Sequence, residues 1–270
     1  MEPIRCLNAK STVFTADHRS ADDFFADMEP SMSVNECIEF SPYFYSKVCS
    51  LENDLGLMDQ ALEFRYQVYV EECSYLPATD YPDKRESDEN DCRSSHFCAF
   101  NLSNELVGYS RLVRADDELR FPFERHCNVF SAGANFPPPE KTVEISRMIV
   151  HRSYRRRRGD HLNGVTLSGS EGDGKVDRRT NSPQILLSLY RQMYVYSKSN
   201  GFLFWYAAME PQVARALSGI GVFKFRQIGP VGDYYGDVAP YIASLDEIEE
   251  SVRARNPAML AWLERPDSGN

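Results

Sequence analysis

One short apolar segment carries two charged residues and constrains the fold more than any other stretch of the 270-residue chain. Val143 to Val150 is rich in β-branched residues, which predicts a central strand. Side chains alternate along a strand, so Glu144 and Ser146 are predicted on one face and Arg147 on the other. Charged groups in a buried strand are costly unless they are paired or used. We therefore expect the chemistry to centre on this strand.

Length and composition predict one main globular domain with extensions. With 42% hydrophobic residues, the chain can cover roughly 70 to 75% of its unfolded surface. A net charge of −10 argues against general nucleic-acid binding. Positive charge gathers locally in the run Arg155, Arg156, Arg157 and Arg158. Such a run favours docking of one acidic partner, although a solvated turn is the ordinary alternative.

The seven cysteines are scattered and form no C-x-x-C pair. An odd, scattered set is typical of a reduced cytoplasmic protein rather than of a disulfide framework. The N-terminus carries Glu2 and no apolar core, and no stretch approaches the roughly 20 apolar residues of a membrane span. The prediction is a soluble protein in the cytoplasm.

The chain divides into three parts by pattern. Residues 1–40 are acidic and weakly periodic, which predicts a loosely ordered extension. Residues 41–246 carry the periodic segments of the main domain, interrupted by a flexible insertion at 159–182 that is rich in glycine, serine and charge. Residues 247–270 are predicted to form a helical tail.

Helical and strand patterns mix within the main domain. Leu57 to Glu72 has helical spacing, and an acidic loop, Pro77 to Ser95, follows it. His96 to Leu102 and Leu106 to Val113 are predicted to form a hairpin. The result is a mixed α/β (α+β) protein with a substantially antiparallel sheet. The other expected elements are strands at Phe40–Val48, Phe202–Ala208, Val222–Ile228 and Val238–Leu245, and helices at Pro183–Ser199, Pro211–Leu217 and Asp246–Leu263, the last interrupted at Pro257.

Charged and aromatic residues recur in a fixed order on these segments. Arg65 and Tyr69 are four residues apart and share one helix face, with Tyr75 just beyond. The order continues with Asp88, Asp91, Arg111, Glu144, Ser146 and Arg147.

This order resembles the acyl-homoserine-lactone synthases, whose pattern is Arg-x-x-x-aromatic, Asp-x-x-Asp, Gly-x-x-Arg-Leu and Glu-x-Ser-Arg. Tyr75 stands where that family has tryptophan. Wider segments resemble the acyltransferases found beside PEP-CTERM/exosortase systems and the N-acyl amino acid synthases. These segments are Arg65–Tyr69, Tyr81–Asp83, Glu86-x-Asp88 and Tyr154–Arg158. The resemblance covers roughly residues 40 to 245.

The resemblance implies the GNAT fold: a twisted, mostly antiparallel sheet splayed at the central strand, flanked by helices, with an acyl thioester in the cleft. An Arg-x-x-Gly-x-Gly/Ala pyrophosphate loop is present only as the fragment Arg158-Gly159-Asp160. An acyl carrier protein is therefore favoured over coenzyme A as donor, with no bound cofactor. That carrier protein is acidic, so it is expected to dock on Arg155 to Arg158.

The central strand supplies the predicted catalytic residues Glu144, Ser146 and Arg147. Acyl transfer needs a neutral amine, and Glu144 is the candidate base, with a backbone N–H of the splayed strand for the oxyanion. Arg147 either joins a charged network or binds the acceptor carboxylate. A structural alternative is that Glu144 simply pairs with Arg147.

Six further residues form the predicted substrate-binding set. The four charged ones alternate in sign, so they form either a substrate-holding or a purely structural network. His126 and His151 as bases, and Cys73 and Cys92 as nucleophiles, are weaker alternatives; the histidines show no metal-ligand spacing. The substrate-binding set is Arg65, Tyr69, Tyr75, Asp88, Asp91 and Arg111.

The sequence thus predicts an N-acyltransferase that moves a fatty acyl chain from acyl carrier protein, or acyl-CoA, to the amine of an amino acid or related molecule. One alternative is an acyl-homoserine-lactone synthase that uses S-adenosylmethionine. A second is a non-catalytic module that binds the carrier protein or lipid. Expected partners are acyl carrier protein and a small amine, with membrane contact only through a lipid product and no nucleic acid.

Overall fold

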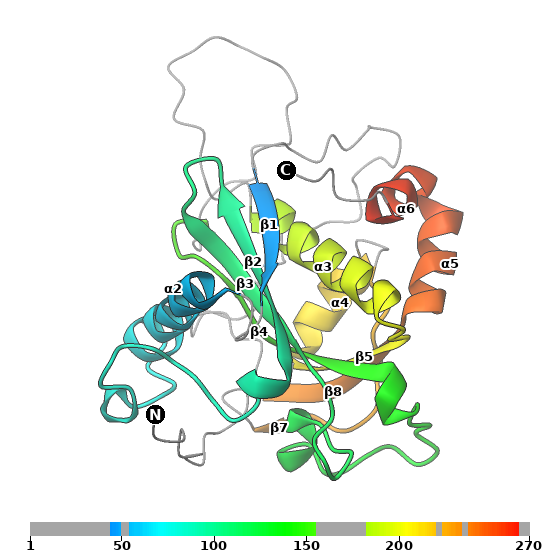
Figure 1. Ribbon diagram of the computed structural model, residues 1–270. Coiled ribbons are helices and arrows are strands. Elements are labelled where there is room, and N and C mark those ends of the chain that lie inside the picture. The colour runs from blue at the N-terminus through cyan, green and yellow to red at the C-terminus, as the bar shows by residue number, and fades with distance from the viewer. Residues whose placement is uncertain (1–43, 50–53, 155–181, 220–222, 234–236, 265–270) are drawn as a thin grey trace.

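A twisted, mixed sheet forms the centre of the protein (Figure 1). The computed structural model describes residues 44–49, 54–154, 182–219, 223–233 and 237–264. The strand order is β1-β2-β3-β4-β5-β8-β6, with β7 paired to β8, and only β4 and β5 are parallel. The strands are β1 (Phe44–Cys49), β2 (Ser94–Asn101), β3 (Leu106–Val113), β4 (Thr142–Val150), β5 (Phe204–Met209), β6 (Arg226–Gln227), β7 (Gly232–Asp233) and β8 (Asp237–Ser244).

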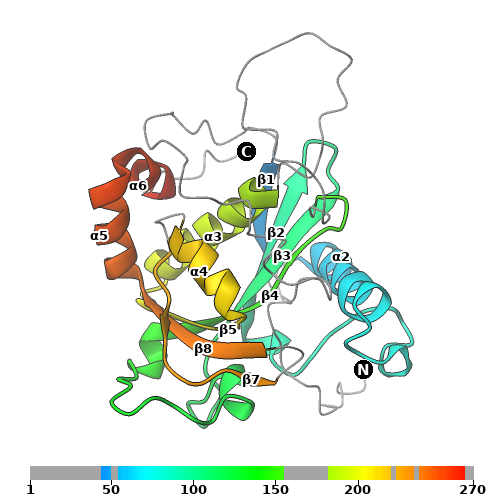
Figure 2. The same ribbon diagram turned by 180° about the vertical axis from the view of Figure 1, so that it is seen from behind.

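Helices cover both faces of the sheet (Figures 1 and 2). α2 packs on one face of β2 to β4, and α3 packs on the other together with α4, α5 and α6. The α-helices are α2 (Leu55–Tyr66), α3 (Ser182–Ser199), α4 (Pro211–Gly219), α5 (Leu245–Arg255) and α6 (Pro257–Glu264). Shorter helices are the π-helix η1 (Gln67–Glu72) and the 3₁₀ turns η2 (Ala78–Asp80), η3 (Asp91–Arg93), η4 (Pro122–Arg125) and η5 (Pro139–Lys141).

No helix within these described ranges has the length and apolar character needed to cross a membrane. The cytoplasmic location stays a prediction.

Local sequence signals set the helix ends. The Asp54 carboxylate accepts a hydrogen bond from Leu57 N at 2.9 Å and caps α2. α3 ends where Gly201 adopts a φ of +74° and Phe202 N donates to Ser197 O at 2.9 Å. Glycine tolerates this left-handed conformation without a steric cost, so the Asn200-Gly201 pair ends the helix.

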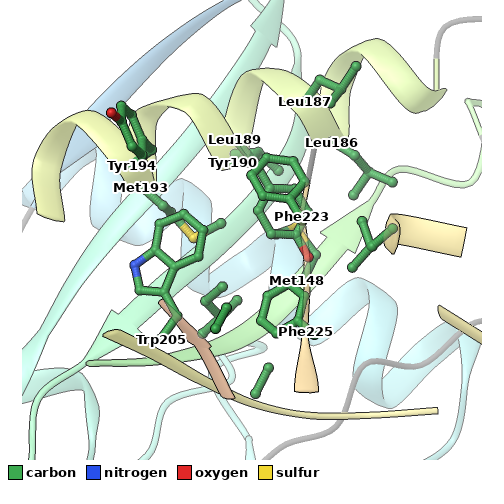
Figure 3. Packing of buried hydrophobic residues seen from close by; sticks show 14 of the residues in the cluster. Met148, Leu186, Leu187, Leu189, Tyr190, Met193, Tyr194, Trp205, Phe223 and Phe225 are labelled. Atoms are coloured by element: carbon green, nitrogen blue, oxygen red, sulfur yellow. The ribbon is translucent and has the colours of Figure 1, made fainter. Parts of the chain in front are cut away.

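The larger apolar core lies between α3 and the sheet (Figure 3). Tyr190 stacks on Phe223 with ring centroids 4.3 Å apart, and both rings lie next to Trp205 of β5. Trp205 donates its indole N–H to Ser197 Oγ at 2.9 Å, which satisfies its polar atom inside the core. α3 and β5 therefore pack directly against each other.

The sheet splays halfway along β4. Parallel pairing with β5 spans Thr142 to Ile145 and ends there, whereas pairing with β3 continues to Val150. In the β3–β4 ladder, Arg147 and Met148 lie opposite the single residue Ser110, which makes a β-bulge. Arg147 has a φ of +55° in this bulge.

The bulge corrects one prediction about the central strand. Simple alternation placed Arg147 on the face opposite Ser146, but its guanidinium reaches Asp88, which also pairs with Arg111. Arg111 in turn donates to Ser146 Oγ at 3.3 Å, so all these groups lie on one face. The alternation prediction was wrong because the bulge inserts an extra residue and shifts the phase.

Most other predicted elements are confirmed. The hairpin, the central strand, the helix after residue 182 and the break at Pro257 are all present. The helix predicted over Leu57–Glu72 changes at Gln67 into a π-helix, and the strand predicted over Val222–Ile228 is only Arg226–Gln227. Residues 1–40, the basic run Arg155 to Arg158 and insertion residues 159–181 lie outside the described residues.

Gly108 of β3 tests the packing of α3 on the sheet. A Cβ at this position would lie 2.5 Å from Ile185 Cγ2 and 3.2 Å from Leu189 Cδ1. We expect Gly108→Ala to lower the free energy of unfolding by about 1 to 3 kcal/mol, because the buried helix must shift. Urea denaturation measures this. Gly56→Ala is the control, since its nearest neighbour would be 3.8 Å away, and an equal loss in both variants would contradict the packing argument.

Candidate active site

Three arginines and three carboxylates form a buried ion network on the α2 face of the sheet. Each of these side chains is almost fully shielded from solvent. The members come from α2, the acidic loop, β3 and β4, so the network joins four segments that are distant in sequence. They are Arg65, Glu86, Asp88, Asp91, Arg111 and Arg147.

Arg147 holds the middle of the network. Its Nη2 and Nε donate to the two oxygens of Glu86 at 2.8 and 3.1 Å, and Nη2 also donates to Asp88 at 3.0 Å. The guanidinium lies over the Tyr69 ring, 5.1 Å from its centroid. This two-point contact with Glu86 is the strong geometry of arginine–carboxylate pairs. Arg147 therefore does not pair with Glu144, which removes the structural alternative for that carboxylate.

The other two arginines close the network. Arg65 donates to Glu86 at 2.5 Å and to Asp91 at 2.6 Å. Arg111 donates to both oxygens of Asp88 at 2.7 Å and also contacts Asp91. Three positive and three negative charges balance, as desolvated ions require.

Electrostatics keep the three carboxylates ionised. Burial alone would raise the pKa of Asp88, but Arg111 and Arg147 hold it well below its ordinary value. The pKa values of Glu86 and Asp91 are lowered in the same way against burial, by Arg147 with Arg65 and by Arg65 with Arg111. Neutralising any one of them would leave a buried guanidinium without its partner.

Two polar side chains on the neighbouring strands extend the network. Tyr109 Oη accepts a hydrogen bond from Arg65 at 3.4 Å and lies 2.7 Å from His96 Nδ1. Burial lowers the pKa of His96 to about 4, so this imidazole is neutral at pH 7.

Glu144 lies in a separate environment on the same face of β4. It is fully buried; its Oε2 accepts a hydrogen bond from Phe123 N at 2.9 Å, and its Oε1 has no partner. Burial raises the pKa of Glu144 to about 8, against the opposing effects of the Phe123 N–H, Arg111 and Arg93. A carboxyl group with a pKa near neutrality can exchange protons at physiological pH, as a general base must.

Aromatic residues neighbour Glu144 on η4 and on β5. The rings of Phe121 and Phe123 pack on Tyr206 with centroids 5.1 and 4.9 Å away. Phe130 continues from Phe123 towards the partly exposed Phe136. The cluster adjoins Glu144 at two points: Phe123 donates its backbone N–H to the carboxyl group, and Tyr206 pairs with Glu144 in the β4–β5 ladder.

The structure brings most predicted site residues together. Arg65, Asp88, Asp91, Arg111 and Arg147 form the network, and Ser146 receives a hydrogen bond from Arg111. Their functional roles stay predictions.

The two predicted aromatic residues belong to the apolar side of the site, in or against the cluster beneath α2. Tyr69 supplies the ring under Arg147, and Tyr75 packs at the edge of the apolar cluster beneath α2.

Three network residues were missing from the predicted site set: Glu86, His96 and Tyr109. Glu86 was part of the Glu86-x-Asp88 segment of the resemblance, but its charge did not distinguish it from the other acids of its loop. His96 lies directly opposite Arg111 in the β2–β3 hairpin, and Tyr109 lies two residues before Arg111 on β3. The pairing of the predicted hairpin was therefore the signal that could have placed both residues near Arg111.

Comparison with known proteins places the fold. Residues 64–163 match the model of the acetyltransferase (GNAT) domain. No curated protein matches the chain by sequence. The chain therefore contains a segment similar to the acetyltransferase (GNAT) domain, within a sheet of GNAT-like fold.

Two acyl-homoserine-lactone synthases of known structure share the fold. The acyl-homoserine-lactone synthase LasI has a TM-score of 0.56 at 14% identity, covering 79% of this chain and 96% of LasI. BjaI is a CoA-dependent acyl-homoserine-lactone synthase that was solved with SAM and isopentyl-CoA. It has a TM-score of 0.53 at 15% identity, covering 82% of this chain and 98% of BjaI. FeeM, an N-acyl amino acid synthase from uncultured soil microbes, has a TM-score of 0.48 at 13% identity, covering 80% of this chain and 98% of FeeM.

These findings confirm the predicted GNAT resemblance and fold. The association with PEP-CTERM/exosortase systems, the lack of a bound cofactor and the carrier-protein donor stay predictions.

Glu86 tests the network. We expect Glu86→Gln to lower the free energy of unfolding by about 3 to 5 kcal/mol, because Arg65 and Arg147 lose a buried counter-charge. Urea unfolding measures the change. Glu63→Gln removes an exposed carboxylate 3.6 Å from Arg85 and should cost less than about 1 kcal/mol. Similar losses in the two variants would show that the network is not a buried, closed set.

Glu144 makes stability depend on pH in a defined direction. Its folded pKa of about 8 lies above the ordinary 4.5, so its contribution is fully present below about pH 4.5 and is lost as pH rises through about 8. Unfolding free energies of the wild type relative to Glu144→Gln should therefore fall by roughly 3 to 5 kcal/mol across this window. A difference that stays constant with pH would rule out the raised pKa.

Proposed function

We propose that this protein transfers a fatty acyl chain from a thioester donor to the amine of an amino acid or a similar small molecule. The observation that carries the proposal is the partnerless Oε1 of Glu144, buried beside the point where β4 separates from β5. A carboxyl group placed there, with a pKa of about 8, is suited to take a proton from an attacking amine.

The reaction balances with one proton transfer to the protein. The amine nitrogen attacks the thioester carbonyl carbon, and Glu144 takes the proton that the nitrogen loses. The tetrahedral intermediate then collapses, the C–S bond breaks and an amide forms. The sulfur leaves as a thiolate and recovers a proton, which Glu144 can return directly or through water.

The splay of the sheet supplies the expected oxyanion donor. Beyond Ile145, β4 has no ladder with β5, so backbone N–H groups on that side are available to the thioester oxygen. A fixed backbone donor costs no reorganisation during the reaction, which is the basis of oxyanion stabilisation.

The ion network positions the site in this proposal. It fixes β4 through Arg147 and fixes the acidic loop through Asp88 and Asp91. Apolar residues of α3 and β5 would contact the acyl chain. We infer that an acyl carrier protein is the donor and docks on Arg155 to Arg158, because only a fragment of a coenzyme A loop is present in the sequence.

Thiol release tests the proposal. The purified protein is incubated with an acyl carrier protein or coenzyme A carrying a long acyl chain, and separately with each amino acid and S-adenosylmethionine. We expect release that needs one acceptor and one donor, with an amide product found by mass spectrometry. Glu144→Gln should lower the rate by about 10² to 10⁴-fold while leaving the protein folded.

Two results would overturn the proposal. A lactone with released methylthioadenosine would identify a homoserine-lactone synthase. Donor binding without release from any acceptor would identify a binding module.

A further inference from the structure

Glu144 and two neighbouring polar side chains have hydrogen-bonding or charge capacity that the protein does not fill. Glu144 Oε1 and Asn90 Nδ2 are buried and have no hydrogen-bond partner, and Arg93 forms no ion pair within the described residues. Polar atoms that are buried without a hydrogen-bond partner lower the stability of the fold. An acceptor, a donor and a cation in one region match the groups of an amino-acid zwitterion.

Arg93 is a half-buried cation held by neutral acceptors. Its Nη1 donates to the carbonyl oxygens of Arg114 and Arg120 at 3.0 and 3.4 Å, and its Nη2 donates to Asn90 Oδ1. These bonds use three of the five guanidinium N–H donors. The position of the cation is fixed, while part of its hydrogen-bonding capacity remains for an anion.

The orientation of Asn90 follows from Arg93. A guanidinium only donates, so the oxygen of the Asn90 amide must face it. The Asn90 NH₂ group then points away without an acceptor, although the residue is completely buried.

The chain between residues 120 and 123 joins these groups to Glu144. Arg93 binds the carbonyl of Arg120, and Glu144 accepts a hydrogen bond from Phe123 N. Those two backbone groups are at most about 10 Å apart along so short a segment. In addition, Ser94, which follows Arg93, lies in one row with Val113 and Glu144 across β2, β3 and β4.

The remaining cations near Glu144 do not offer a carboxylate site. Arg111 binds both oxygens of Asp88, and Arg147 binds both oxygens of Glu86. Of the two arginines that lower the pKa of Glu144, Arg111 and Arg93, only Arg93 lacks a carboxylate partner.

We propose that Arg93 and Asn90 bind the α-carboxylate of the acceptor and hold its amine against Glu144. The acceptor class is then α-amino acids with a free carboxylate, rather than simple amines. This inference rests on the proposed acyl transfer. It assigns the carboxylate to Arg93 instead of Arg147, whose guanidinium edge is already occupied.

Paired acceptors test the proposal. The donor is the acylated thioester that supports thiol release in the assay described above. With this donor, kcat and KM are measured for leucine and leucinamide, and for phenylalanine and phenylalaninamide. The amide keeps the shape, removes the negative charge and has a less basic amine, which by itself would favour the amide. We expect the wild type to prefer the free acid by at least about tenfold in kcat/KM, mainly through KM.

Variants then locate the carboxylate. Arg93→Gln should bring the ratio between acid and amide to about one, and Arg93→Lys should keep part of the preference because it retains the charge but not the fork. Asn90→Asp places a competing carboxylate on Arg93 and should also abolish the preference. Melting temperatures show whether each variant is folded; if Arg93→Gln does not fold, the other two decide the question.

Arg114→Gln is the matched control. Arg114 is an exposed neighbour whose Nε donates to Arg93 O at 3.4 Å, and its loss changes the net charge equally. It should retain the wild-type ratio; an equal drop would show a general charge effect and overturn the proposal. Equal use of acids and amides by the wild type would overturn this inference alone, whereas absence of transfer to any amine would overturn the proposed function.

Discussion

Charge balance in the buried network is the constraint on which the rest of the structure depends. Three guanidinium groups and three carboxylates from four segments are removed from water together. Each ion is acceptable only because the others are present, so α2, the acidic loop, β3 and β4 must have fixed relative positions. The bulge at Arg147 fits this need, since it turns one more cation onto the shared face.

The same face contains carboxyl groups in two opposite states. Glu86, Asp88 and Asp91 are ionised because arginines surround them, whereas Glu144 has no ion pair within the described residues and burial raises its pKa to about 8. The carboxylates that are paired with arginines fix the position of the strand. The carboxyl group of Glu144, which has no such partner, remains available for proton transfer. Environments that separate the pKa values of similar groups are a common way to divide such roles.

Sequence reasoning could predict the elements and much of the site, since apolar periodicity determines strands and helices. It also predicted alternating charges on neighbouring segments. It could not predict the face of Arg147, because a bulge leaves no mark on the hydrophobic pattern. Glu86 was indistinguishable by charge from the other acids of its loop, and Arg93 acquires its setting from backbone carbonyls whose positions depend on the completed fold.

The separation of β4 from β5 has a consequence for association between molecules. Among the described strands, the second half of β4 has no partner on its β5 side, and such edges normally invite pairing with other chains. Here the edge lies inside a sheet, with β3 on one side, β5 diverging on the other and α3 across one face (Figure 1). A strand from another protein would have to enter between two strands of the same sheet to reach it. The fold can thus keep backbone groups unpaired without presenting them as a template for aggregation.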